Sequence, residues 1–354
     1  MSKVELEDTQ INLLLNLAFL KGKRSLKIRS PLINTDLFEV TLNRRLWSCR
    51  SCIEEEELHQ NVGEVKSKLP KKMGEEIPGY DAIAKVIISS GTFDAEDFGD
   101  DFANAVRLMK GKPGKYFVCL DTNVLYNRFV SSVFDPYLQE NLDYYPKFMI
   151  SNLMRNEIEK KMNHRYNEKE VEHLVDIGGE ICEEFKNQYT LGSRKAKFAH
   201  SELHWIETEV RPGEYGEEKF LEDNEMRDIR ILREYEEAGK KIGKRPLVFG
   251  FENSFNYKAE DKELEYIHLK YPENVLDIEV GHEDLYRLIR YLTQLYGVIQ
   301  LKGLGCRALG VWENMDEIDY ESGRIKFVFE GKTSLYEELS RCEELSTAIR
   351  EAMR

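Results

Sequence analysis

The sequence predicts an α/β protein with a central parallel sheet flanked by helices, an N-terminal α+β extension and a C-terminal α/β appendage. Between residues 116 and 280, short apolar runs alternate with long helical patterns, which is typical of βαβ units. The stretch "KGKPGK" at residues 110–115 has the glycine and proline content of a boundary. We therefore expect three regions, which cover residues 1–112, 113–280 and 281–354.

The first region mixes helical and strand patterns. Apolar spacing predicts a helix over residues 11–20, strands around 25–33 and 37–46, and a charged helix from about residue 53. Two further helical patterns follow in "EEIPGYDAIAKVI" and "AEDFGDDFANAVRLMK". Basic clusters such as "KGKRSLKIR" and "KSKLPKK" also lie here. This region either binds single-stranded RNA or packs as an ordinary domain with a salt-bridged surface.

The other two regions have a clearer pattern of elements. In the central region, strands are predicted at residues 116–120, 146–150, 247–251 and 275–280, with helices between them. In the last region, we expect a helix at 283–296, short strands at 297–302, 306–312 and 324–330, and an amphipathic helix at 333–353.

Composition limits the partners of this chain. The net charge of −14 has the wrong overall sign for a nucleic-acid binder, so any phosphate-binding surface has to be local. The longest apolar stretch, residues 11–20, is too short to cross a membrane and contains two asparagines. No secretory signal is recognisable, so we expect a cytoplasmic protein without a membrane partner.

Two of the predicted strands end in a carboxylate. Asp121 directly follows the apolar run "YFVCL", and Glu252 follows "LVFGF". An aspartate in "LDTN" can be a turn or helix-cap residue. It can also be part of a site at the carboxyl edge of a parallel sheet, where open α/β folds place their chemistry.

Two predicted helices bring further acids toward the same edge. Ser151 is a plausible N-cap, which places Glu157 in the second turn of the helix that begins there. In "LEDNEMRDIRILREYEEAG", Glu225 and Asp228 share a helix face. Carboxylates gathered at one edge repel one another and have raised pKa values unless a divalent cation lies among them.

This arrangement resembles the PIN-domain nucleases. "VCLDTNVL" is similar to the first motif of that family, "RDIRIL" to its Asp-x-x-Ile-Leu helix, and "VFGFENSFNYKA" to its later strand. Glu157 lies where the family has its second acid. The chain departs from the family at the later strand, where Gly250 replaces a threonine and Glu252 an aspartate. The resemblance covers about 165 residues, and it implies a PIN-like fold for the central region.

The resemblance implies a metal-dependent endoribonuclease that uses Mg²⁺ or Mn²⁺, which prefer oxygen ligands. Its catalytic metal ligands would be Asp121, Glu157, Asp228 and Glu252. Thr122, Asn123, Ser151, Glu225 and Asn253 would support them. Basic residues in "GSRKAKF", namely Arg194, Lys195 and Lys197, are candidates for substrate contacts. RNA is the expected partner, DNA is the alternative substrate, and a homodimer is a further option because dimers are common in that family.

Two alternatives differ in chemistry. Haloacid dehalogenases also begin at a strand-end aspartate, but they need a second aspartate where this chain has Asn123. The other alternative is a catalytically degenerate PIN fold that acts as a scaffold or binding module in an RNA-related assembly. The altered fourth acid and the negative net charge favour it. A nuclease should bind Mn²⁺ at Asp121 and a scaffold should not.

Overall fold

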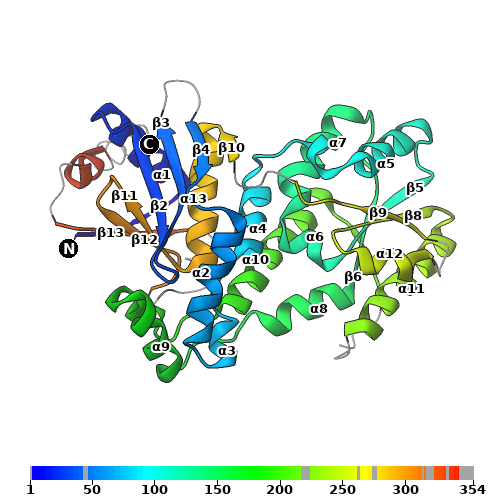
Figure 1. Cartoon of the computed structure of the whole chain (residues 1–354). Coiled ribbons are helices and arrows are strands. Elements are labelled where there is room, and N and C mark those ends of the chain that lie inside the picture. Colours follow the sequence, from blue (N-terminus) through cyan, green and yellow to red (C-terminus); the bar gives the residue numbers. More distant parts are fainter. Residues whose placement is uncertain are drawn as a thin grey trace, which may run out of the picture. The chain divides into compact units, whose positions relative to one another are not determined.

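The computed structural model describes residues 2–42, 47–216, 224–260, 264–272, 277–312, 315, 323–331 and 335–342. The chain is α/β and forms two compact units, which we describe separately (Figure 1). The first unit combines Met1–Val86, Arg165–Leu191 and Leu276–Arg354, and the second combines Ile87–His164 and Gly192–Val275.

The first unit contains an eight-stranded sheet in which every strand pairing is antiparallel. Its strand order is β1-β13-β12-β11-β2-β3-β4-β10. The strands are β1 (Ser2–Leu6), β2 (Ser25–Ser30), β3 (Thr35–Leu42), β4 (Trp47–Ser51), β10 (Asp277–Val280), β11 (Val298–Lys302), β12 (Cys306–Leu309) and β13 (Ile325–Phe329). In β2 burial alternates with a period of two, as expected for a sheet with one face on the core.

Helices cover the apolar face of this sheet. In α13 (His282–Tyr296), Leu285, Leu288, Leu292 and Leu295 recur at helical spacing and all are buried. This helix contacts α1 (Asp8–Leu20) and the strands β10 to β13. The unit also contains α2 (Glu55–Ser67), α3 (Lys71–Gly74), most of α4 (Tyr80–Ser90), α9 (Glu168–Gly178) and the 3₁₀ helix η3 (Glu180–Phe185), and residues 335–342 are helical.

The second unit is built on the predicted parallel sheet. Its five strands have the order β7-β6-β5-β8-β9, and each neighbouring pair is parallel. They are β5 (Tyr116–Leu120), β6 (Phe148–Ser151), β7 (Gly213–Tyr215), β8 (Arg245–Gly250) and β9 (Glu265–His268). All five residues of β5, the central strand, are buried, as its continuous apolar run predicts.

The helices of the second unit connect these strands. They are η1 (Ala95–Phe98), α5 (Asp100–Gly111), α6 (Thr122–Tyr126), the π-helix η2 (Val130–Phe134), α7 (Asp135–Asn141), α8 (Asn152–Lys161), α10 (Leu191–Trp205), the π-helix η4 (Ile206–Val210), α11 (Asn224–Ile242) and α12 (Asn253–Glu260). The chain goes from β5 outward to β6 and β7, then returns to β8 on the other side of β5. The boundary between β5 and β8 is therefore the topological switch point of this sheet.

The structure groups the chain differently from the three expected regions. Residues 1–112 and 281–354 are not separate, because β11 pairs with β2 within one sheet. Residues 165–191 also belong to this first unit, whereas α5 belongs to the second. The strand expected at 275–280 is β10, which pairs with β4 and not with the parallel sheet. The predicted helix at 333–353 lies mostly outside the described residues.

The strands β7 and β9, at the two edges of the parallel sheet, were not predicted. They contain three and four residues, which is too short for a periodic signal in the sequence. Among the described residues, no helix is both long and apolar enough to cross a membrane.

Candidate functional site

The candidate site lies at the carboxyl edge of the parallel sheet, at its switch point. Asp121 follows β5 and is the N-cap residue of α6, but its side chain makes no capping hydrogen bond. Glu252 follows the neighbouring strand β8. The sheet thus brings together two acids that are 131 positions apart in the sequence, at the place where open α/β sheets bind ligands.

Asp121 is a buried acid in an electrostatically unfavourable place. Only 4% of its surface is exposed. Burial, together with repulsion from Glu252 and Asp228, raises the pKa of Asp121 to about 7. Hydrogen bonds from the Thr122 backbone and the Asn123 side chain oppose this shift. The carboxyl group is therefore near its midpoint of ionisation at neutral pH.

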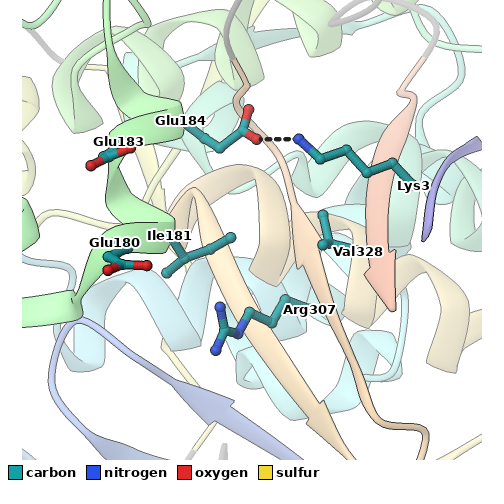
Figure 2. A pocket seen from close by; sticks show the side chains of 7 residues that line it. All are labelled: Lys3, Glu180, Ile181, Glu183, Glu184, Arg307 and Val328. Carbon is teal, nitrogen blue, oxygen red and sulfur yellow. Dashed lines mark hydrogen bonds and ion pairs between the residues drawn. The ribbon is translucent and has the colours of Figure 1, made fainter. Parts of the chain in front are cut away.

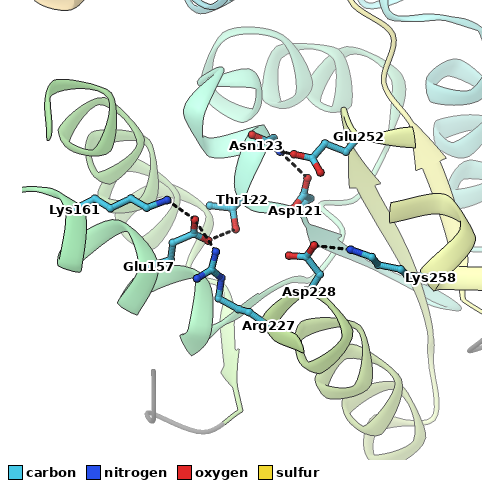
Figure 3. A network of polar contacts seen from close by, with 9 residues as sticks. All are labelled: Asp121, Thr122, Asn123, Glu157, Lys161, Arg227, Asp228, Glu252 and Lys258. Atoms are coloured by element: carbon cyan, nitrogen blue, oxygen red, sulfur yellow. Dashed lines mark hydrogen bonds and ion pairs between the residues drawn. The ribbon is translucent and has the colours of Figure 1, made fainter. Parts of the chain in front are cut away.

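Asn123 connects the two strand-end acids. Its Nδ2 donates to Asp121 Oδ2 at 3.4 Å and also to Glu252 Oε1. Both carboxylates thus have one amide in common, which restrains their orientations (Figure 3). This position agrees with the supporting role that the sequence suggested for Asn123, while its bond to Glu252 was not foreseen.

Asp228 comes from α11 and faces the same place. Figure 3 shows the carboxylates of Asp121, Glu252 and Asp228 lying toward one another. Burial raises the pKa of Asp228, Lys258 opposes the shift, and repulsion from Glu252 adds to it. Lys258 Nζ, on α12, donates to Asp228 Oδ2 at 2.8 Å. A lysine therefore compensates part of the negative charge of this group.

Glu157 lies on the other side of Thr122, and basic side chains compensate its negative charge more completely than that of Asp228. Its Oε1 is 2.7 Å from Lys161 Nζ and 3.1 Å from Arg227 Nη2. Thr122 Oγ1 donates to Oε2 at 3.3 Å. The side chain is buried, as is Arg227. The sequence placed Glu157 near the sheet edge, but it gave no indication of these two cations.

The other predicted residues have different positions. Ser151 caps α8 by accepting from the Leu153 backbone N–H at 3.1 Å, as expected. Its hydroxyl also donates to the buried Glu234 at 2.6 Å. Asn253 is exposed at the start of α12. The side chain of Glu225 lies outside what the structure describes.

The basic cluster does not form an exposed strip. Arg194 and Lys197, both in α10, are 0% and 2% exposed, and Lys195 is half-buried. Arg194 and Lys197 therefore do not present their charges to solvent in this structure, in contrast to the substrate contact expected from the sequence. Phosphate contacts would have to come from other residues.

Gly250 and Tyr266 pack together at the site in a way that the sequence did not indicate. A Cβ atom on Gly250 would lie 2.5 Å from the Tyr266 hydroxyl and 3.0 Å from the Asp121 Cβ. Tyr266, on the unpredicted strand β9, donates its hydroxyl to the Glu252 backbone carbonyl at 2.9 Å. The tyrosine thus occupies the space that a threonine at position 250 would need.

The oxygen atoms of these side chains are chemically suited to a hard divalent cation, but the side chains lie too far apart to bind one as they stand. Carboxylate and amide oxygens are the ligands that Mg²⁺ and Mn²⁺ prefer, and a cation would relieve the repulsion on Asp121. Among the described residues, however, no three His, Cys, Asp or Glu side chains are close enough together to hold a metal ion. The carboxylates would have to move together for a cation to bind.

Comparison of the chain with models of protein families, with curated proteins and with solved structures finds no match. The geometry of the site and the local motifs are therefore the basis for assigning a function.

Proposed function

We propose that the second unit is a PIN-like, metal-dependent nuclease, most specifically an endoribonuclease that hydrolyses RNA phosphodiester bonds. The observation that carries this proposal is the convergence of Asp121, Glu252 and Asp228 at the switch point of a parallel sheet. Three acids from three different segments face the same place. Asp121 directly follows β5, and Glu252 lies two positions after the end of the adjacent strand β8. The preference for RNA and for internal cleavage comes from the motif resemblance.

In this proposal, three acids bind the metal and two further residues hold them in place. Asp121, Glu252 and Asp228 would hold Mg²⁺ or Mn²⁺, and Asn123 would keep the first two oriented. When bound, such a cation activates a water molecule and neutralises negative charge at the phosphate. Lys258 would hold Asp228 in place through its 2.8 Å hydrogen bond.

Glu157 has a different role in this proposal. Its bonds to Arg227 and Lys161 offset its charge, so it would direct a cation less strongly than Asp121 does. It would instead fix Thr122, the residue after Asp121, and would reach a metal only through water. We therefore assign Glu157 to positioning.

The test is a cleavage assay on labelled single-stranded RNA, hairpin RNA and matched DNA, in Mn²⁺, Mg²⁺ or EDTA. We expect metal-dependent cleavage of RNA by the wild type and by Asp143→Asn, which alters an exposed aspartate of the same unit. Asp121→Asn should lose at least about 100-fold in rate, since it removes a group central to the metal site. Equal activity of the Asp121→Asn and Asp143→Asn variants would refute the catalytic role of Asp121.

A scaffold without catalytic activity is the second candidate. Two observations favour it. Basic side chains already pair with Glu157 and Asp228, and among the described residues no three acids are close enough together to hold a metal ion. Direct Mn²⁺ titration separates the two functions. A nuclease should bind Mn²⁺ in a manner that Asp121→Asn abolishes, whereas a scaffold should bind RNA or a protein partner without any such metal dependence.

A further inference from the structure

A polar cavity of about 440 Å³ lies within the first unit. It is lined by Arg29, Pro31, Asn34, residues 177–181, Gln300 and Arg307. A second cavity of about 250 Å³ shares Glu180, Ile181 and Arg307 with it (Figure 2). No residue of the second unit lines either cavity, so a ligand bound here would be independent of the proposed nuclease function.

The floor of the larger cavity is a row of hydrogen-bond donors on three adjacent strands. Gln300 on β11 is directly opposite Arg29 on β2 and directly opposite Arg307 on β12. Cross-strand neighbours project from the same face of a sheet. Neighbouring strands are about 4.8 Å apart, so the two arginine backbones lie roughly 10 Å apart with the glutamine between them. That distance lets two guanidinium groups reach one small anion from opposite sides.

The wall facing this row is formed in part by main chain. Gly178 has no room for a side chain, since a Cβ atom would lie 2.5 Å from Cys182 Sγ. Gly179 has a φ angle of +80°, a conformation that glycine adopts at little cost. Glycine at both positions keeps this part of the wall free of side chains. Beyond them, the exposed Glu180 brings a carboxylate to both cavities.

Positive charge is incompletely compensated along the floor. Asp36 on β3 serves two cations, Arg29 Nη1 at 2.9 Å and Lys302 Nζ at 2.7 Å. Burial raises the pKa of Asp36, but hydrogen bonds from Lys302 and Arg29 outweigh burial and hold it below its ordinary value. Arg307 is 3.7 Å from a half-exposed Glu330 carboxylate, a distance beyond a normal hydrogen bond. Arg307 therefore retains donors for a ligand, and Figure 2 shows it extending toward the segment with Glu180 and Ile181.

We propose that this cavity binds the terminal phosphate of a phosphomonoester together with at most the one nucleotide that carries it, with the phosphate between Arg29 and Arg307. Arginine is suited to this task because its planar group binds phosphate through two parallel hydrogen bonds. Gln300 and Asn34 add neutral donors, and Glu180 accepts from a hydroxyl group of the ligand. The volume of about 440 Å³ lies within the range of small-molecule sites.

The phosphate can belong to a free nucleotide or to the 5′ end of an oligonucleotide, and calorimetric titration of the full chain in EDTA distinguishes the two. The probes are inorganic phosphate, adenosine 5′-monophosphate, adenosine, and a short RNA with a 5′-phosphate or a 5′-hydroxyl. We expect the monophosphate to bind and adenosine not to bind. Arg307→Gln should weaken binding of the monophosphate at least tenfold, or about 1.4 kcal/mol.

The matched control is Lys27→Gln, which removes one positive charge from the same sheet face. Lys27 is opposite Glu39 and does not line the cavity. If the positive charge of the sheet face attracted the ligand in a general way, both variants would bind the monophosphate equally weakly. A phosphate site at Arg307 instead predicts that Lys27→Gln lowers the affinity less than about twofold. Equal losses in the two variants, or binding that Arg307→Gln leaves unchanged, would overturn the proposal.

The affinities of the other probes identify the source of the phosphate. Tighter binding of the phosphorylated RNA than of the monophosphate assigns the site to an RNA end, and the reverse assigns it to a free nucleotide. If no phosphate-bearing probe binds, the proposal is wrong. Hydrogen exchange of the wild type gives a second measurement that needs no variant. The monophosphate should slow exchange in residues 177–181 and in β12, and protection confined to the second unit would contradict the assignment.

Discussion

Asp121→Asn should make the protein more stable at neutral pH while removing its proposed activity. The folded chain raises the pKa of this carboxyl group from 3.8 to about 7. At 1.36 kcal/mol per pKa unit, keeping Asp121 ionised in the folded state costs about 4 kcal/mol. An asparagine carries no charge but must still bury a polar amide. We therefore expect a net gain of about 1–3 kcal/mol at pH 8.

The sign of the pH dependence is set by proton binding. Between about pH 4 and pH 7, the folded chain holds a proton on Asp121 that the unfolded chain has released. The free energy of unfolding of the wild type therefore falls as pH rises through this range. Below about pH 4 the penalty is absent, and above about pH 8 it is complete. The advantage of Asp121→Asn should grow over the same window and then level off.

Hydrogen exchange of the β5 amides is the appropriate assay, because it reports the opening of the second unit by itself. Wild type, Asp121→Asn and Asp143→Asn would be compared in EDTA at pH 5 and pH 8. A gain of 1.4 kcal/mol appears as about tenfold slower exchange when the segment recloses faster than its amides exchange, because the exchange rate then follows the opening equilibrium. If Asp121→Asn is less stable at both pH values, or if its effect does not change with pH, the electrostatic account of this site is wrong.

Two further substitutions test the packing of the site. Arg227→Met should destabilise the second unit by about 3 kcal/mol, because it leaves the buried Glu157 with Lys161 as its one remaining basic partner of these two. Denaturant unfolding measures the loss of stability. Gly250→Ala should cost more than about 1 kcal/mol, since the new methyl group would meet the Tyr266 hydroxyl. Adding Tyr266→Phe should recover much of that loss, and strictly additive effects in this double-mutant cycle would contradict the proposed clash.

The sequence located the central part of the site because its signals are local. A five-residue apolar run with "DTN" after it predicted both the buried strand β5 and the position of Asp121. The acids on α8 and α11 were predicted from the same kind of local pattern. The pairing of Arg227 with Glu157 and of Lys258 with Asp228 was not predicted, because the partners belong to different segments and no local pattern encodes such distances.

The strands that were assigned to the wrong region are those that pair with strands far away in the sequence. Leu301 on β11 is opposite Ile28 on β2, and nothing in either strand indicates the other. The strand β10 was assigned to the parallel sheet because its apolar pattern fits either kind of sheet. Gly250 similarly looks like a lost threonine in the sequence, while the structure shows Tyr266 filling that space from another strand.

The way in which basic side chains pair with the acids of the site indicates that Asp121 is kept for function. The chain compensates Glu157 with two cations and Asp228 with one. Asp121, the most buried of the three, is opposed by two acids and receives hydrogen bonds from backbone and amide groups. A fold selected for stability alone would gain from a neutral residue there, so the cost is expected to be offset by function.

A divalent cation would relieve this cost by displacing the proton from Asp121. Because metal and proton compete for the same carboxylate, Mn²⁺ affinity should fall by about tenfold for each pH unit below about 7. Affinity that is independent of pH between 5 and 7 would place the cation elsewhere. In that case the acids at the switch point would not form the metal site, and a scaffold without catalytic activity would be the better account of this fold.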